Sequence, residues 1–208
     1  MSLAFASSSQ AEEGAKAAKD ASKTPATDSL VYLNGGGGVS YVGLTTFNSS
    51  ELALGNAGGV GGAVDVGMGL RLVLFTLGPR LRYHSLSAFD MWQINMEVAL
   101  HVPVRKWDGY VGLHGGYSFV GKLTKAAFSD ASSPTPTDDL RVRGFDVGLQ
   151  LGLDYYFAKY VSVGGELSGE VLFVRRPALA TSKDPQFGMA GGGIGFGAVA
   201  GLHVGLHL

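Results

Sequence analysis

Apolar and polar residues alternate along most of the chain from about residue 30 onward. A period of two is typical of β-strands that have one apolar face and one polar face. In the segment 145–155, for example, Leu149, Leu151 and Leu153 alternate with Gln150 and Gly152. The alternation recurs in eight segments, which predict strands near residues 31–45, 60–74, 77–86, 92–102, 110–119, 145–155, 161–173 and 194–206.

The connections between the predicted strands differ in length in a regular way. Tight turns fall near Phe75, 105–108 and 157–160, whereas long connections rich in Ser, Thr, Pro, Asp and Gly cover 46–58, 122–140 and 174–187. The connection at 86–90 is short and is the exception. Short turns at one end and longer loops at the other predict an all-β fold: an eight-stranded antiparallel up-and-down transmembrane β-barrel with both termini at the turn end.

The composition narrows the class of protein. The chain has 208 residues, 33 of them glycine, with 16% charged residues and a mean hydropathy of +0.19, which is less charge than a soluble domain usually carries. The net charge is −1 and there is no Lys/Arg block, so the basic surface of a nucleic-acid-binding protein is missing. The absence of cysteine excludes thiol nucleophiles, disulfides and zinc–thiolate sites. No run of about 18 apolar residues occurs, so a membrane-spanning segment must be a strand.

The alternation alone does not say whether the apolar face points outward to lipid or inward, as in a soluble ligand-binding barrel. Six of the predicted strands alternate clearly, and none of these has a charged residue on its apolar face. The other face carries mostly glycine and serine with scattered charges, which suits a narrow lumen better than a solvated surface. The strands also exceed the roughly 5 to 6 residues usual in globular proteins. We therefore predict that apolar side chains face lipid and charged side chains face the lumen.

Aromatic residues gather near both ends of the predicted strands, which predicts two interfacial girdles. The turn-end group is Phe75, Trp107, Tyr155, Tyr156, Phe157 and Tyr160. The loop-end group is Phe47, Phe89, Trp92, Tyr117, Phe119, Phe145, Phe173 and Phe187. The alternative explanation is that aromatic residues simply favour strands.

The N-terminal segment has a different composition. Residues 1–29 are rich in Ala, Lys, Ser, Asp and Thr with few large apolar side chains, so we expect a flexible tail. A short helix over 11–23 would be marginal on its own. The first residues have small side chains like the end of a secretory signal peptide, but they lack its basic and full apolar regions. We therefore expect that a signal peptide was removed and that its remnant lies here.

With this pattern, residues 30–208 resemble the small eight-stranded outer-membrane barrels of the OmpA, OmpX and OmpW type. The resemblance rests on strand pattern and connection length, with no shared motif. It implies a porin-like membrane protein of a Gram-negative bacterium, surrounded by outer-membrane lipid, with both termini periplasmic. Such barrels usually end in an aromatic residue, whereas this sequence ends in Leu206, His207 and Leu208.

A set of charged and polar residues falls on the predicted lumen face. An Arg or Lys that faced lipid at the bilayer midplane would cost about 2 to 4 kcal/mol, so these residues must point inward. We predict that they form a cross-strand polar belt that fills the lumen and blocks a continuous water channel; alternatively, the charges merely neutralise one another. The members are Asp65, Arg71, Arg80, Arg82, Glu97, His114, Asp146, Asp154, Glu166 and Glu170.

Counting from the predicted turns gives the expected neighbours within this belt. Arg80 is expected opposite Glu97, and Glu97 opposite His114. Asp146 is expected opposite Glu170. Paired carboxylates can hold a cation or share a proton, but charge balance is the commoner explanation for acids near arginines.

The sequence has no strong signature of catalysis, of a cofactor or of a metal site, and we predict no residue for any of these. His101, His203 and His207 lie toward the turn end, but their strands are not neighbours, and only His203 and His207, which share a face, have the tight spacing of metal ligands. His84 and the nearby Ser85 and Ser87 form a strand-end cluster that matches no esterase signature.

The leading functional hypothesis is a non-enzymatic integral outer-membrane protein that acts structurally or as a surface for interactions. The loops 46–58, 122–140 and 174–187 are the candidate contacts for an extracellular partner. The second hypothesis is a narrow pore or transporter for small or apolar solutes. A lipid-modifying enzyme and a soluble ligand-binding barrel rank lower, and no nucleic-acid partner is expected.

Overall fold

A computed structural model describes residues 29–48, 58–123, 141–178 and 189–208, and these residues form eight β-strands. The strands are β1 (Val31–Asn48), β2 (Gly58–Leu72), β3 (Phe75–Leu86), β4 (Phe89–Val104), β5 (Trp107–Leu123), β6 (Arg143–Ala158), β7 (Val161–Arg176) and β8 (Gly191–His207). Within the described residues there is no helix long and apolar enough to cross a bilayer. The tail predicted for 1–29 lies outside the described residues except for Ser29.

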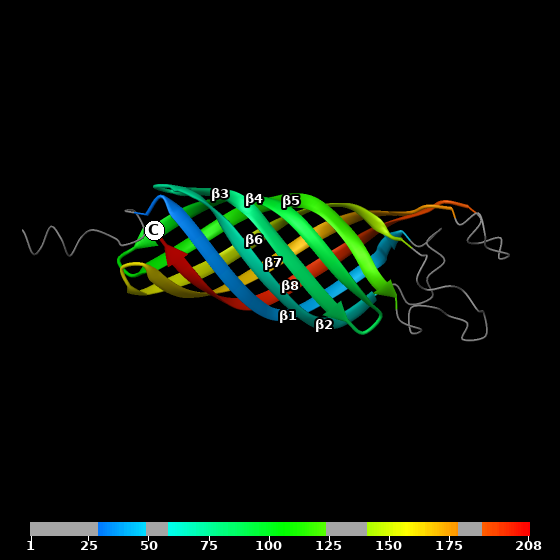
Figure 1. The fold of residues 1–208 in the computed structure, drawn as a ribbon, viewed down its shortest axis with the longest axis horizontal. Coiled ribbons are helices and arrows are strands. Elements are labelled where there is room, and N and C mark those ends of the chain that lie inside the picture. The colour runs from blue at the N-terminus through cyan, green and yellow to red at the C-terminus, as the bar shows by residue number, and fades with distance from the viewer. Residues whose placement is uncertain (1–28, 49–57, 124–140, 179–188) are drawn as a thin grey trace, which may run out of the picture.

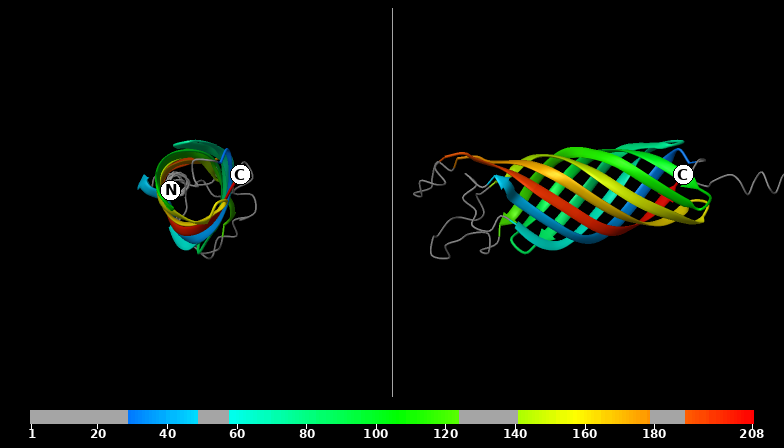
Figure 2. Two further views of the ribbon diagram at one scale, coloured as in Figure 1. Left: turned by 90° about the vertical axis from the view of Figure 1, so that its left-hand side faces the viewer. Right: turned by 180° about the vertical axis from the view of Figure 1, so that it is seen from behind.

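The eight strands close into one antiparallel barrel. Each strand pairs with its neighbour in the sequence, and β1 pairs with β8 to close the cylinder, with Val39 opposite Ala200. Figure 1 shows the C-terminus and the tight turns at one end, called the turn end below. The opposite end, where the strands joined by the long connections end, is called the loop end. Figure 2 shows the closed outline along the barrel axis. The predicted eight-stranded up-and-down barrel is confirmed.

The three tight turns at the turn end each contain two residues between paired strands. Val73 and Arg105 begin two of these turns and adopt positive φ angles of 54° and 57°. Two-residue hairpins favour turns with positive φ because their twist matches that of the flanking strands. Val73 is unusual at such a position because a β-branched side chain crowds the backbone there.

The apolar side chains face outward, as the alternation predicts. Leu149, Leu151 and Val98 have exposed fractions of 59%, 57% and 42%. A soluble barrel with an inward apolar core would bury these residues, so the structure contradicts that alternative. The outer surface is thus an apolar band around the cylinder, and the charged side chains of the polar belt lie within it.

The aromatic residues lie near the strand ends as predicted, but two of them do not belong to the outer surface. Trp107 stacks on Tyr155 on the outer surface at the turn end, with ring centroids 4.9 Å apart. Tyr156 and Phe89 are instead buried, with exposed fractions of 1% and 0%, because their positions in the pleat point into the lumen. Phe187 lies outside the described residues.

The barrel interior contains polar layers over most of its length and an apolar layer at the loop end. The apolar layer, called the apolar cluster below, consists of buried side chains from several strands: Val42, Leu44, Leu86, Ala88, Phe89, Met91, Val120, Val142, Leu172 and Val174. The sequence pattern did not predict it, because strands that are apolar on both faces lose their alternation at these ends.

Candidate functional site

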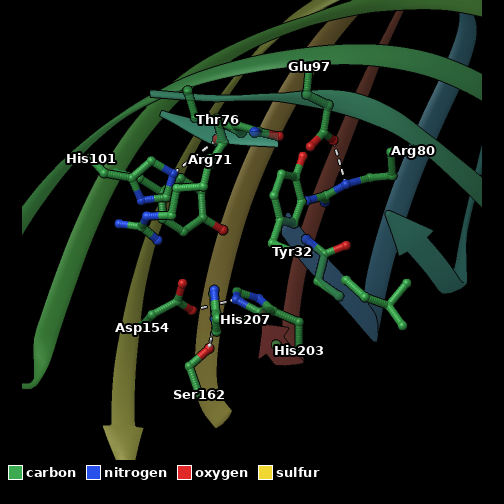
Figure 3. Close-up of a pocket in the computed structure, with 16 residues that line it drawn as sticks. Tyr32, Arg71, Thr76, Arg80, Glu97, His101, Asp154, Ser162, His203 and His207 are labelled. Carbon is green, nitrogen blue, oxygen red and sulfur yellow. Dashed lines mark hydrogen bonds and ion pairs between the residues drawn. The ribbon is translucent and has the colours of Figure 1, made fainter. Parts of the chain in front are cut away.

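The interior at the turn end is organised around one buried ion pair. Arg71 Nη2 lies 2.6 Å from Asp108 Oδ2, and both side chains are almost fully buried. Arg71 Nη1 also donates a hydrogen bond to the Tyr156 hydroxyl at 3.0 Å. His101 Nδ1 lies 3.1 Å from the same Asp108 oxygen, and its Nε2 lies 3.0 Å from Thr76 Oγ1. Figure 3 shows Arg71, Thr76 and His101 close together inside the barrel.

The two histidines of β8 make separate contacts in this region. His203 Nε2 lies 2.6 Å from Asp154 Oδ1, and His207 Nε2 lies 2.9 Å from Ser162 Oγ (Figure 3). A serine–histidine pair needs a carboxylate on the far nitrogen to act as a triad, but His207 Nδ1 faces the Tyr156 hydroxyl at 3.4 Å instead. Within the described residues, the histidines of the turn end therefore form neither a triad nor a group of three metal ligands.

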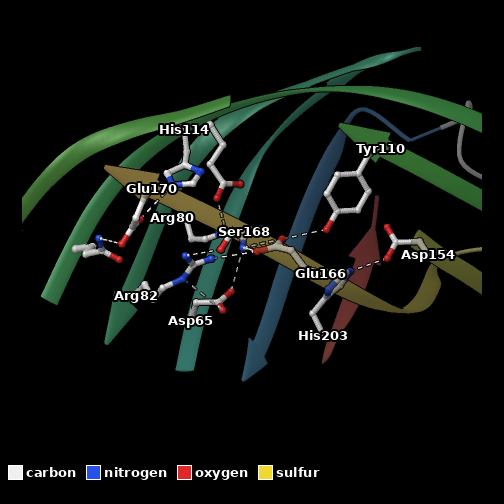
Figure 4. A network of polar contacts seen from close by, with 12 residues as sticks. Asp65, Arg80, Arg82, Tyr110, His114, Asp154, Glu166, Ser168, Glu170 and His203 are labelled. Carbon is white, nitrogen blue, oxygen red and sulfur yellow. Dashed lines mark hydrogen bonds and ion pairs between the residues drawn. The ribbon is translucent and has the colours of Figure 1, made fainter. Parts of the chain in front are cut away.

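The middle of the lumen contains a cluster of opposite charges, called the arginine belt below. Arg80 is at its centre and contacts Glu97 through Nε and Glu166 through Nη1, the latter at 2.7 Å. Arg82 Nη2 donates to the same Glu166 oxygen at 3.0 Å, and Asp65 lies 3.6 Å from Arg80 and 3.9 Å from Arg82. Figure 4 shows Arg80 and Arg82 on one side of the lumen and Glu166 reaching them from the other. The arginine belt thus crosslinks β3 to β7 through the interior.

The strand register corrects two of the predicted pairings. Arg80 lies opposite Asn95, and Gly78 lies opposite Glu97, so the predicted Arg80 pairing is wrong by two residues. Asp146 lies opposite Leu172, and Glu170 lies opposite Gly148, which is again a difference of two. The predicted pairing of Glu97 with His114 is confirmed. A shift of two residues keeps each side chain on the lumen face, so the Arg80–Glu97 ion pair forms diagonally.

A third polar layer, called the histidine–acid layer below, lies between the arginine belt and the apolar cluster. His114 Nε2 is 3.2 Å from Glu170 Oε2, and Ser118 Oγ donates to Asp146 Oδ2 at 2.5 Å. Gln93 Nε2 donates to Glu170 Oε1 at 2.7 Å. The predicted polar belt did not include Gln93, Ser118 and the neighbouring His84, because an uncharged polar residue on the lumen face carries no distinctive signal.

The strand-end cluster around His84 does not form an esterase site. The ring nitrogen His84 Nε2 lies 2.7 Å from Gln93 Oε1, and the side chain is fully buried in the lumen. Ser85 is exposed and belongs to the outward face of β3. The pleat therefore separates His84 from Ser85, and the esterase hypothesis loses this candidate pair.

Lumen glycines leave room for the large polar side chains. Gly152 lies opposite Tyr110, and a Cβ at Gly152 would overlap the Tyr110 ring. The Tyr110 hydroxyl reaches across to donate to Glu166 Oε2 at 3.0 Å. Because a narrow barrel of eight strands has little interior space, glycine on one strand lets a ring from the next strand lie over it.

A small cavity lies among these layers. Its volume is about 40 Å³, and it lies in the turn-end half, lined by residues that include Arg71, Arg80, Glu97, His101 and His203. A water molecule needs roughly 10 to 15 Å³ of such space, so the cavity has room for only a few. A space of this size is sufficient for water molecules that hydrate the neighbouring ion pairs.

We expect Glu97→Ala to destabilise the barrel. Glu97 is 6% exposed and forms an ion pair with Arg80, so its loss removes that ion pair and leaves more positive charge buried. The expected loss is about 1 to 3 kcal/mol in the free energy of unfolding, measured by thermal unfolding in detergent. Glu97→Gln, which keeps an acceptor, should lose less. An unchanged melting point for Glu97→Ala would show that the contact with Arg80 contributes nothing.

Comparison with solved structures finds a protein with a similar fold. The chain is similar to neisserial surface protein A, with a TM-score of 0.58, 9% sequence identity, and coverage of 86% of this chain and 97% of that one. The fold is that of a small outer-membrane β-barrel. The resemblance seen in the sequence is thereby confirmed for the fold.

Two further solved barrels align with lower scores. OprG from Pseudomonas aeruginosa has a TM-score of 0.45 and 9% identity over 89% of this chain and 100% of that chain. AlkL, solved in lipid bilayers, has a TM-score of 0.46 and 11% identity over 100% of this chain and 98% of that chain. No model of a known protein family matches the sequence, and no curated protein sequence matches it.

Proposed function

We propose that this protein is a non-enzymatic integral outer-membrane β-barrel whose lumen is closed by its own side chains. The observation that carries the proposal is the arginine belt, where Arg80 and Glu166 meet across the lumen at 2.7 Å. Between the belt and the loop end, the histidine–acid layer and the apolar cluster fill the interior. The apolar outer band is evidence that the barrel is surrounded by hydrocarbon, because water solvates such a surface poorly.

The orientation follows from the two unlike ends. Both β1 and β8 have their free ends at the turn end, next to the two-residue turns. In outer-membrane barrels the short turns are periplasmic and the longer connections extracellular. The proposal therefore puts both termini in the periplasm.

The loops are the proposed surface for an extracellular partner. The predicted loops 46–58, 122–140 and 174–187 all connect strands at the loop end, although most of their residues lie outside the described part of the chain. With the lumen closed, the loop end is the part of the barrel that a molecule outside the cell can contact. This supports a role in adhesion or structure over one in transport.

Conductance in planar bilayers tests the closed lumen. We expect reconstituted protein to give no steady single-channel steps, because the ion pairs of the arginine belt occupy the path. Heat-modifiable migration on a gel, measured on the same sample, shows that the barrel is folded. Steady steps from a folded sample would contradict the proposal and support the narrow pore.

One observation favours a second function, a route for apolar molecules. The apolar cluster contains Phe89, Met91 and Leu172, which would offer such a molecule an apolar environment just inside the loop end. A barrel with this function would also be silent in conductance. It would, however, speed the uptake of an apolar fluorescent probe into liposomes, whereas the closed barrel would not.

A further inference from the structure

The histidine–acid layer brings one imidazole and two carboxylates together. His114, Asp146 and Glu170 each offer a ligand atom, and these atoms lie within 4.8 Å of one another. Their exposed fractions are 4%, 1% and 3%. Ligand atoms about 2.0 to 2.2 Å from a metal ion lie roughly 3 to 4.4 Å from one another. Small side-chain movements are therefore sufficient to bring the three atoms into one coordination sphere.

The sheet is built to let these side chains meet. His114 of β5, Gly148 of β6 and Glu170 of β7 lie in one row across three neighbouring strands. A Cβ at Gly148 would overlap the His114 ring, so glycine in the middle of the row leaves the space in which the two flanking side chains meet. Asp146 is two residues from Gly148 on the same strand and therefore on the same face.

The hydrogen bonds around the layer leave one oxygen of Asp146 without a partner among the described residues, and they pair the second oxygen of Glu170 with the histidine. Gln93 Nε2 holds Glu170 Oε1 at 2.7 Å, and Ser118 Oγ holds Asp146 Oδ2 at 2.5 Å. Asp146 Oδ1 is buried and accepts no hydrogen bond from the described residues. Glu170 Oε2 faces His114 Nε2. Groups that hold the second oxygen of a ligating carboxylate are a regular feature of metal sites, because they orient the ligand.

The charges in this layer are also unbalanced. Among the described residues, no Arg or Lys nitrogen lies within 4.0 Å of Asp146 or Glu170. Two buried carboxylates this close repel each other unless a cation or a proton compensates them. A cation between the free Asp146 oxygen and Glu170 would remove this repulsion.

We propose that His114, Asp146 and Glu170 bind one divalent first-row transition-metal ion such as Zn²⁺. Imidazole and carboxylate together are ligands that Zn²⁺ accepts, whereas Ca²⁺ and Mg²⁺ prefer oxygen alone. From the sequence alone, charge balance was the favoured explanation for the two acids. The structure shows in addition that a histidine lies beside them. The ion joins three adjacent strands and neutralises the layer.

The position of the site predicts how the ion is acquired. The arginine belt lies on one side of the layer and the apolar cluster on the other, so both routes through the lumen are blocked. The metal is therefore bound as the barrel folds and then exchanges slowly.

The test is to refold the full-length chain from urea into detergent with Zn²⁺, with Ca²⁺, or with a chelator only. Each folded sample is then washed with chelator, and metal is counted by elemental analysis. We expect about one zinc per wild-type barrel, no retained calcium, and a higher melting temperature for the zinc-refolded sample. Less than about a tenth of a zinc per barrel would overturn the proposal and leave a shared proton as the explanation of the paired acids.

Variants connect the bound metal to these residues. Asp146→Asn and His114→Gln should each reduce retained zinc about tenfold or more. Asp154→Asn is the matched control, because Asp154 is also a buried acid in contact with a histidine but belongs to no group of three ligands among the described residues. It should retain zinc like the wild type. Equal zinc in Asp146→Asn and the wild type would overturn the assignment.

A spectroscopic measurement covers the case in which a variant does not fold. Wild-type barrel is refolded with Co²⁺ in place of Zn²⁺ and washed with chelator. Absorption bands shifted from those of aqueous Co²⁺ are expected, because nitrogen and carboxylate ligands replace water around the ion. A spectrum without bound Co²⁺ would count against the site without recourse to any variant.

Discussion

Arg80→Met is expected to lower the free energy of unfolding of the barrel by about 3 to 5 kcal/mol, the cost of removing one partner from a buried ion pair. Arg80 is 5% exposed and contacts Glu97, Glu166 and Asp65. Its loss leaves three carboxylates with Arg82 as the remaining nearby arginine. Unfolding by urea in lipid vesicles, followed by tryptophan fluorescence, measures the change.

Arg175→Met is the matched control for this prediction. Arg175 is an exposed residue of β7 that points away from the lumen. Its removal should change the free energy of unfolding by less than about 0.5 kcal/mol, as is usual for surface substitutions. Equal losses for both variants would show that the arginine belt does not stabilise the barrel more than any surface arginine does.

Leu149→Arg is expected to destabilise the barrel in lipid by about 2 to 4 kcal/mol, because an arginine at the bilayer midplane is poorly solvated. Leu149 lies near the middle of β6 and is 59% exposed on the outer band. The measurement is again urea unfolding in vesicles. The prediction tests the proposed membrane location directly, since the same arginine on a water-exposed surface would cost almost nothing.

Two controls isolate the effect of lipid on Leu149→Arg. Leu149→Ala removes the same apolar side chain without adding charge, and its loss should be smaller. Val102→Arg is the depth control, because Val102 lies near the turn end of β4 and is 61% exposed. An arginine there should cost about 0 to 1 kcal/mol. Equal costs at both depths would contradict a membrane-spanning band.

The strands and their faces could be predicted from the sequence, because both depend on local alternation. Leu149 and Gln150 are assigned to opposite faces by adjacency alone, and the structure agrees. The predicted pairing of Arg80 was wrong because it depends on the position of the connection between β3 and β4, which must be known to within one residue. That connection consists of residues 87–88, and its position sets the partner of every residue on β3 that faces β4.

The contacts across the lumen could not be predicted from hairpins. Arg80 and Glu166 are 86 residues apart and sit on strands that are not neighbours in the sheet. Their contact depends on the diameter of the closed cylinder. The pairing of neighbouring strands does not by itself give that diameter. The approach of His114 to Glu170 likewise requires the glycine at position 148 to be in the right row.

The pairing of β1 with β8 has a consequence for the order of assembly. This seam joins the first and last strands of the chain, so it has the longest loop closure of any strand pair and should form last. Until it forms, two edges carry unpaired backbone groups that hydrocarbon cannot solvate. Insertion and closure must therefore be coupled, and a chain that stops before β8 should be unable to close in the bilayer.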